Sequence, residues 1–244
     1  MDHRAHALDI ARRFTAGLDD AAGVALVGSV ARGTDHPHSD IDLIAAADTR
    51  PGTTVHHVEG RMVTLTRKTP ADLAAAFTHP WEAGAAVPAW RSALILRDSG
   101  EALAGLQARA RDWTWDAIAD ACDRWAAAEL VGLAEEVHKI HGMLALARPR
   151  AAAANRLLLA LSLAAPLAAA GRVSYESEND LWDNVAAAEG PAWARAWDLA
   201  AGVAPAGHEA GCRAALDLYR HAADRLIDHL DANGRAVVDT ARRL

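Results

Sequence analysis

The spacing of apolar residues changes in kind near residue 110. Before that point, short apolar runs typical of strands alternate with segments of helical periodicity. The strand-like segments are Val24–Val27, Ile41–Ala46, Thr54–Glu59, Arg61–Lys68 and Ala93–Arg97. The helical segments are His3–Leu18, a helix that starts at Thr69-Pro70, and Glu101–Ala110. This alternation predicts a mixed α/β unit in which Gly60 turns a hairpin.

After Arg111 the strand patterns stop and only helical periodicity is left. The predicted helices are Asp116–Ala147, Arg150–Ala170, Glu178–Ala188, Pro191–Ala201 and Gly207–Asp231, with Gly234 ending the last one. A chain of 244 residues is long enough to bury two small cores. The expected fold class is therefore a mixed α+β domain over residues 1–110, followed by an all-α helical-bundle domain over residues 111–244.

Charge and composition exclude some classes of partner. The net charge is −7, and no basic stripe is present that could displace counterions from a polynucleotide, so we expect no nucleic acid partner. The N-terminus lacks the apolar core of a signal peptide. The longest apolar run, Leu157–Ala170, is too short to span a bilayer and contains Ser162 and Pro166. A cytoplasmic protein with no membrane partner is expected.

Two acids stand at the start of the second predicted strand, in Ser39-Asp40-Ile41-Asp42-Leu43. Residues at positions i and i+2 of a strand point to the same face, so Asp40 and Asp42 can hold one metal ion together. Magnesium takes oxygen ligands and keeps some of its sites for water and phosphate oxygens. Such an acid pair is therefore suited to phosphoryl or nucleotidyl transfer.

A second polar segment follows the first predicted strand. Gly28 allows a tight turn there, Ser29 can start a short helix, and Arg32 lies one turn further on, where it can reach an anion. Either segment alone is typical of an ordinary turn or of solvated acids. Together, in the order strand, turn, helix and strand, they favour a phosphate pocket beside a metal site.

These residues resemble the signature of the nucleotidyltransferase superfamily, which is Gly-Ser, a spacer of about ten residues, and then Asp-hydrophobic-Asp. Here ten residues separate Ser29 from Asp40. Within the superfamily, the chain is most similar to the kanamycin (aminoglycoside) nucleotidyltransferases in its length and in its change to helices. Ile95–Gly100 and Leu133–Lys139 are among the local stretches that agree. The first domain is thus expected to be a nucleotidyltransferase domain.

The resemblance implies specific roles for residues of this chain. Ser29, Arg32 and Ser39 would contact the nucleotide phosphates beside Gly28, and Asp40 and Asp42 would bind Mg²⁺. A glutamate on a helix of the second domain would act as general base, with a lysine four residues later contacting phosphate. Glu135 and Lys139 match that pair, and Glu136 is the alternative base.

The implied activity is transfer of a nucleoside monophosphate, AMP from ATP, to a hydroxyl of a small acceptor such as an aminoglycoside, hence antibiotic resistance, in a homodimer. One departure bears on catalysis, because Thr64 stands where the family places a third carboxylate, which leaves the number of metal ions open. Two alternatives therefore stand beside the enzyme. One is a protein-adenylylating, antitoxin-type nucleotidyltransferase, and the other is a nucleotide-binding protein that has lost catalysis.

Overall fold

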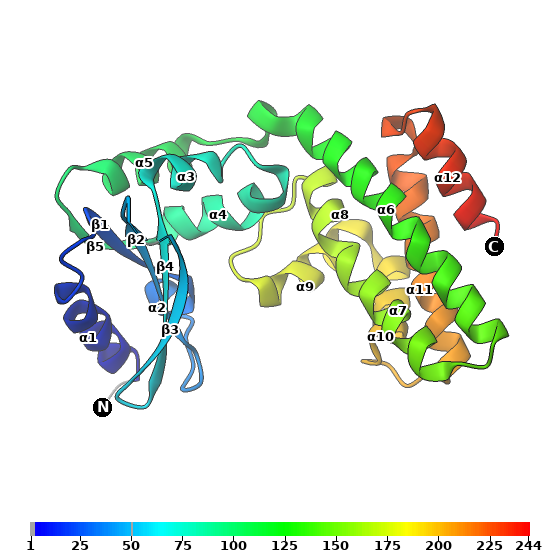
Figure 1. The fold of residues 1–244 in the computed structure, drawn as a ribbon, viewed down its shortest axis with the longest axis horizontal. Helices are drawn as coiled ribbons and strands as arrows, with labels where there is room; N and C mark the ends of the chain where they lie inside the picture. The colour runs from blue at the N-terminus through cyan, green and yellow to red at the C-terminus, as the bar shows by residue number, and fades with distance from the viewer. Residues whose placement is uncertain (1–2, 50) are drawn as a thin grey trace. The chain divides into compact units, whose positions relative to one another are not determined.

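The computed structural model describes residues 3–49 and 51–244, and the chain divides into two compact units (Figure 1). One unit ends at Thr114 and the other begins at Trp115. The first unit contains a five-stranded sheet. Its strands are β1 (Gly23–Val27), β2 (Ile41–Ala46), β3 (Gly52–Val58), β4 (Arg61–Lys68) and β5 (Leu94–Asp98). All five lie within two residues of the segments that the sequence predicted.

The sheet has the strand order β3-β4-β2-β1-β5, so β2 lies in its middle. The pair β2 and β4 is parallel, and the other neighbouring strands are antiparallel. The hairpin of β3 and β4 turns at Glu59 and Gly60, which both adopt positive φ (50° and 80°). This is the backbone twist that a two-residue hairpin turn requires.

Helices cover both faces of the sheet. The helices of this unit are α1 (His3–Ala16), α2 (Gly28–Arg32), α3 (Pro70–Ala75), α4 (Pro80–Ser92) and α5 (Ala102–Asp112). Helix α1 packs on one face, where Ile10 meets Leu26, Ile41 and Leu43 in a buried cluster. Residues of α3, α4 and α5 form a second cluster on the opposite face, around Trp90. Thr69 caps α3 as predicted, since its side chain accepts a hydrogen bond from the Asp72 N–H.

The second unit consists of helices and connecting loops over its described residues. Its α-helices are α6 (Ala119–Ala145), α7 (Pro149–Ser162), α8 (Ala164–Ala170), α9 (Glu178–Glu189), α10 (Pro191–Ala201), α11 (His208–Leu226) and α12 (Ala232–Arg242). Two short 3₁₀ turns, Trp115–Ile118 and Ile227–His229, precede α6 and α12. The long helix α6 packs against α7, α8, α11 and α12. The predicted fold class, a mixed α/β unit followed by a helical one, is confirmed.

Helix α4 of the first unit was not predicted, and the helices of the second unit are divided differently from the prediction at two places. The segment Arg150–Ala170 was expected as one helix but is broken at Leu163 into α7 and α8. Pro166 explains the break, because proline has no N–H to donate to the preceding turn and its ring crowds the carbonyl four residues earlier.

The second difference concerns Gly234, which was expected to end the last helix. Helix α11 instead ends at Leu226, and Gly234 lies inside a further helix, α12. Asp231 caps α12 by accepting a hydrogen bond from the Gly234 N–H at 2.6 Å. A side chain at this position would meet Val131 of α6, since an ideal Cβ would lie 3.1 Å from Val131 Cγ2. A larger residue here would require Val131 to shift by a few tenths of an ångström, so the packing on α6 favours a glycine.

One stretch of the described chain, Pro149–Ala170, has the length and hydropathy of a membrane span. It comprises α7 and α8, its mean hydropathy is 1.5, and 44% of the apolar window is buried inside the structure. A single stretch of this kind is weak evidence for a membrane span, and both helices pack on α6.

Candidate active site

The acid pair lies where strand β2 begins. Ile41 and Leu43 are almost fully buried against α1, at 0% and 1% exposure. Because side chains alternate along a strand, Asp42 points to the opposite face of the sheet, and Asp40, one residue before β2, has the same parity. Both carboxylates are half-buried. Ile41 and Leu43 thus anchor the strand and aim the two acids to the other side.

The Gly28 turn lies directly against Asp42. Gly28 follows β1 with φ of +72°, and an ideal Cβ placed on it would lie 2.5 Å from Asp42 Oδ2. The pairing of β1 with β2 explains this proximity, since Val27 is the partner of Asp42 in the antiparallel register. The predicted turn and the predicted acid pair are therefore brought together by the sheet.

Strand β4 adds a hydroxyl to this group. Thr64 is the partner of Asp42 in the parallel register of β2 and β4. Its Oγ1 donates a hydrogen bond to Asp40 Oδ2 at 3.2 Å. Its neighbours Val63 and Leu65 are buried in the cluster beneath α1, so Thr64 lies on the same face as the two acids. The position where the family was expected to place a third carboxylate therefore carries a neutral donor that contacts Asp40.

Helix α2 places the two remaining residues of the turn. It spans five residues, Gly28–Arg32, and begins with no side-chain cap. The Ser29 carbonyl accepts hydrogen bonds from the N–H groups of Gly33 and Thr34, and Gly33 has a φ of +78°. Ser29 and Arg32 are both half-buried. The helix predicted to start at Ser29 is present, although it forms little more than one turn.

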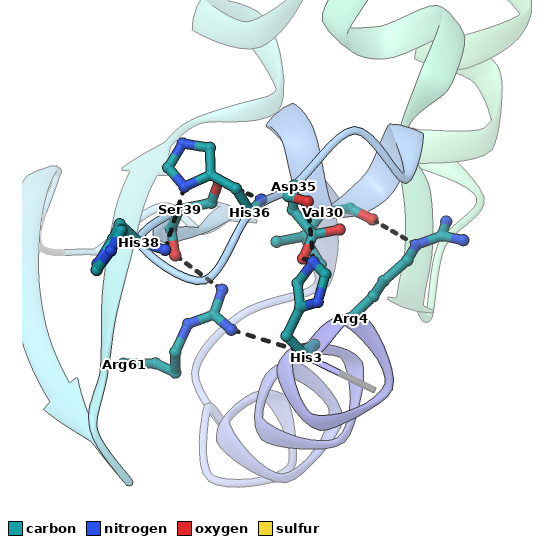
Figure 2. A network of polar contacts seen from close by, with 8 residues as sticks. All are labelled: His3, Arg4, Val30, Asp35, His36, His38, Ser39 and Arg61. Carbon is teal, nitrogen blue, oxygen red and sulfur yellow. Dashed lines mark hydrogen bonds and ion pairs between the residues drawn. The ribbon is translucent and has the colours of Figure 1, made fainter. Parts of the chain in front are cut away.

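The loop between α2 and β2 is held by its own polar groups. The His36 N–H donates to Ser39 Oγ at 3.0 Å, and the His38 N–H donates to His36 Nδ1 at 3.1 Å (Figure 2). Ser39, predicted to contact phosphate, is thus an acceptor within its own loop, and its hydroxyl hydrogen is still able to donate.

Two arginines outside the signature hold α2 and the loop that connects it to β2. Arg61 on β4 is buried, at 8% exposure, and donates from Nη2 to the Ser39 carbonyl at 2.8 Å and from Nη1 to the His3 carbonyl at 3.4 Å (Figure 2). Arg4 donates to the Val30 and Ala31 carbonyls at the end of α2, at 3.2 Å each.

Sequence reasoning gave no role to Arg4 or Arg61. A signal was present for Arg61, because it shares its strand parity with Val63 and Leu65 and therefore points into the buried face. A charged residue at a core-facing position is rarely buried without partners, so its burial implies a structural contact. Its partner here is the backbone of the residue directly before Asp40.

The donor set around Asp42 fits one oxygen-liganded divalent cation. Asp40 and Asp42 supply carboxylate oxygens on one face, and the missing Cβ of Gly28 leaves the Asp42 carboxylate its space. Magnesium is commonly held by one or two carboxylates together with substrate phosphates. Over residues 3–49 and 51–244, no cluster of three or more His, Cys, Asp or Glu side chains has the arrangement of a metal site. A cation here would therefore depend on nucleotide oxygens.

The remaining predicted residues belong to the second unit, on α6. Lys139 Nζ lies 3.0 Å from both Glu135 Oε1 and Glu136 Oε1, and these two acids raise the pKa of Lys139, with the Glu136 hydrogen bond as the larger cause. The side chain of Glu135 is 71% exposed, whereas that of Glu136 is only 9% exposed and its Oε2 is buried. The predicted pair Glu135 and Lys139 thus exists as an ion pair, anchored by Glu136.

Comparisons with known proteins agree with this geometry at the level of the fold. Residues 8–54 match the family model for the nucleotidyltransferase domain. The chain is also similar to the crystal structure of a nucleotidyltransferase-like protein from Exiguobacterium sibiricum 255-15. The TM-score is 0.56 at 12% sequence identity, over 98% of this chain and 79% of the other. No functionally curated protein matches the chain.

The matched segment covers α1, β1, α2, β2 and the start of β3, so it includes both Gly28-Ser29 and the acid pair. The similar structure extends the likeness of fold to the rest of the chain. Residues 8–54 thus match a nucleotidyltransferase domain, and the chain shares its fold with a nucleotidyltransferase-like protein.

Proposed function

We propose that this protein transfers a nucleoside monophosphate, AMP from ATP, to a hydroxyl group of a small acceptor. The observation that carries the proposal is the placement of Asp40 and Asp42 on one face of β2, directly against the Gly28 turn. A superfamily match supports nucleotidyl transfer in general. ATP as the donor and an aminoglycoside-type acceptor follow from the resemblance alone.

In the proposed reaction the acceptor oxygen attacks the α-phosphorus of ATP, the bond to the leaving pyrophosphate breaks, and the acceptor loses its proton to a base. Asp40 and Asp42 hold the cation, and Ser29, Arg32 and the hydroxyl hydrogen of Ser39 bind phosphate oxygens around the Gly28 turn. A bound Mg²⁺ would neutralise charge on the phosphates. Each of these residues would orient or stabilise the group that is transferred. Catalysis of such reactions consists mainly of positioning and electrostatic stabilisation.

We assign the proton acceptor to Glu135 and the phosphate contact to Lys139. The two neighbouring acids differ in exposure, and this difference supports the choice. The carboxylate of Glu135 is largely exposed, so an acceptor can reach it. Glu136 Oε2 is buried, so a substrate hydroxyl has no access to it in this conformation. Glu136 instead fixes the Lys139 ammonium that Glu135 shares. The assignment gives these adjacent acids different tasks.

Calorimetric titration of Mg·ATP into the wild-type protein and into the double variant Asp40→Asn, Asp42→Asn tests the site. Binding that depends on magnesium and is lost in the variant is expected. Asp48→Asn serves as the matched control, since Asp48 is an exposed acid two residues after β2. Binding that survives in the double variant, or that is absent from the wild type at millimolar ATP, would refute the site.

Screening acceptors for pyrophosphate release then tests the chemistry, with aminoglycosides first and other polyhydroxylated amines next. Pyrophosphate released only with an acceptor, together with label from [α-³²P]ATP on that acceptor, is expected. Label on a polypeptide would instead support protein adenylylation. Tight Mg·ATP binding without release under any acceptor would support the binding protein that Thr64 suggests.

The same resemblance leads us to propose a cytoplasmic homodimer. Light scattering on the purified protein measures its mass directly, and the expected value is twice the 25.8 kDa of the chain. A mass of one chain at micromolar concentration would contradict the dimer without affecting the proposed reaction.

A further inference from the structure

Strand β4 places a hydroxyl group, and no acid, beside the two aspartates. Thr64 is the register partner of Asp42, and its Oγ1 donates to Asp40 Oδ2 at 3.2 Å. The contact depends on the parallel pairing of β2 and β4, which continues for six residue pairs from Ile41 and Val63. Thr64 is therefore held by the sheet, beside the point where the preceding loop enters β2.

We infer that Thr64 is a positioning residue that orients Asp40 and limits the site to a single divalent cation. The inference rests on the proposed function, since it concerns the cation that Asp40 and Asp42 would hold there.

The protein ligands of the site suit one cation. Asp40 and Asp42 are the two carboxylates on this face, and with nucleotide oxygens they complete the ligands of one divalent cation. A second cation would need a further protein carboxylate, and Thr64 offers a neutral hydroxyl at the neighbouring position on the same face. No third His, Cys, Asp or Glu completes a metal cluster with them in the described parts of the chain. Magnesium with two carboxylates fills its other positions with phosphate oxygens and water.

The direction of the hydrogen bond explains how Thr64 positions Asp40. A hydroxyl that donates to Asp40 Oδ2 fixes the rotation of that carboxylate and leaves Oδ1 as the less engaged oxygen. Hydrogen bonds to charged groups are among the stronger ones in proteins, so the orientation is maintained when substrate is absent. Valine has the shape of threonine without this donor. Serine keeps the donor.

Counting Mn²⁺ tests the inference without measuring turnover. Protein saturated with α,β-methylene-ATP is dialysed against Mn²⁺, and bound metal per chain is measured against a chamber that holds nucleotide alone. The variants are Thr64→Ser, Thr64→Val and Thr64→Asp, with Thr66→Val as the matched control. Thr66 lies two residues further along β4 on the same face, where its hydroxyl contacts Thr53 Oγ1 at 3.1 Å.

One Mn²⁺ per chain is expected for the wild type, Thr64→Ser and Thr66→Val at similar affinity. Thr64→Val should still bind one ion, about tenfold more weakly, because a hydrogen bond to a charged ligand is lost. Thr64→Asp should bind a second ion. Thermal unfolding followed by circular dichroism establishes that each variant is folded.

The possible failures are distinct. Two ions bound by the wild type, or unchanged affinity in folded Thr64→Val, would overturn the inference and leave the proposed function intact. A folded Thr64→Asp that still binds a single ion would overturn the claim that residue 64 sets the number of ions. A folded wild type that binds no Mn²⁺ above the nucleotide reference would refute the proposed function as well.

Discussion

The carboxylate of Asp42 occupies the space that a side chain at position 28 would need. An ideal Cβ on Gly28 would lie 2.5 Å from Asp42 Oδ2, and Gly28 also has a φ of +72°. Glycine is favoured at position 28 for two reasons, the positive φ of its backbone and the close approach of the Asp42 carboxylate. The Gly28-Ser29 turn and the acid pair are therefore in direct contact, and a side chain at position 28 would displace Asp42.

Gly28→Ala should therefore abolish magnesium-dependent nucleotide binding and lower stability by about 1–3 kcal/mol, through strain at positive φ and displacement of Asp42. Calorimetric titration and chemical denaturation measure the two effects. Gly60→Ala is the matched control, since Gly60 also has positive φ but an added Cβ there would meet nothing within 4 Å. Gly60→Ala should lose stability and keep nucleotide affinity. Equal binding by both variants would contradict the role given to the Asp42 contact.

Arg61→Met should lower stability by about 1–3 kcal/mol, because the Ser39 and His3 carbonyls lose their donor. We also expect weaker magnesium-dependent ATP binding, since the residue before Asp40 is no longer held. Arg67→Met is the comparison on the same strand. Arg67 pairs with Asp20 at 3.0 Å near the other end of β4, so its loss should affect stability alone. Affinity that falls equally in both variants would show a general effect of unfolding.

Glu135→Gln should lower kcat by about 100-fold or more if Glu135 accepts the proton. Its stability should change by less than about 0.5 kcal/mol, because the side chain is 71% exposed. Steady-state kinetics with an identified acceptor give kcat, and the KM for ATP should stay near that of the wild type. Glu136→Gln removes the buried partner of Lys139 and is expected to raise the KM for ATP more than it lowers kcat. The reverse pattern would transfer the role of base to Glu136.

The ion pair of Asp123 and Arg172 should make the stability of the second unit depend on acid pH. Arg172 donates to Asp123 Oδ1 at 2.8 Å and to Oδ2 at 2.9 Å, and this contact lowers the pKa of Asp123. A carboxyl group with a lowered pKa in the folded state stabilises the fold above its unfolded pKa of about 4. That contribution is lost as pH falls through the folded pKa.

Asp123→Asn should therefore lower stability at pH 7 by about 1–3 kcal/mol and flatten its decline below about pH 4. Urea denaturation at a series of pH values measures both quantities. Glu209→Gln removes the acid of an exposed pair, since Arg213 and Glu209 side chains are 67% and 75% exposed, and should change stability by less than about 0.5 kcal/mol. An unaltered pH profile in Asp123→Asn would exclude this pair as the source.

Local patterns were sufficient for much of the fold. Strands such as Ile41–Ala46 were predicted because their apolar residues alternate or run together between turn residues, and β2 has these same bounds. The helix cap at Thr69 follows from a short side chain that accepts a hydrogen bond from a nearby N–H group. Such features depend on neighbours in sequence. The break at Leu163 was missed although Pro166 is a local signal for it. The helix around Gly234 was missed because it depends on packing against α6.

Periodicity and turn residues are local properties, so they were enough to predict the class of each unit and to locate Gly28-Ser29 and Asp40-Asp42. What these residues contact depends on the pairing of distant strands. Pairing of β1 with β2 brings Gly28 against Asp42, and pairing of β2 with β4 brings Thr64 to Asp40. Arg61 reaches Ser39 from a strand 22 positions later in the chain. Strand register is set by long-range packing of the buried face, so no local pattern specifies these contacts.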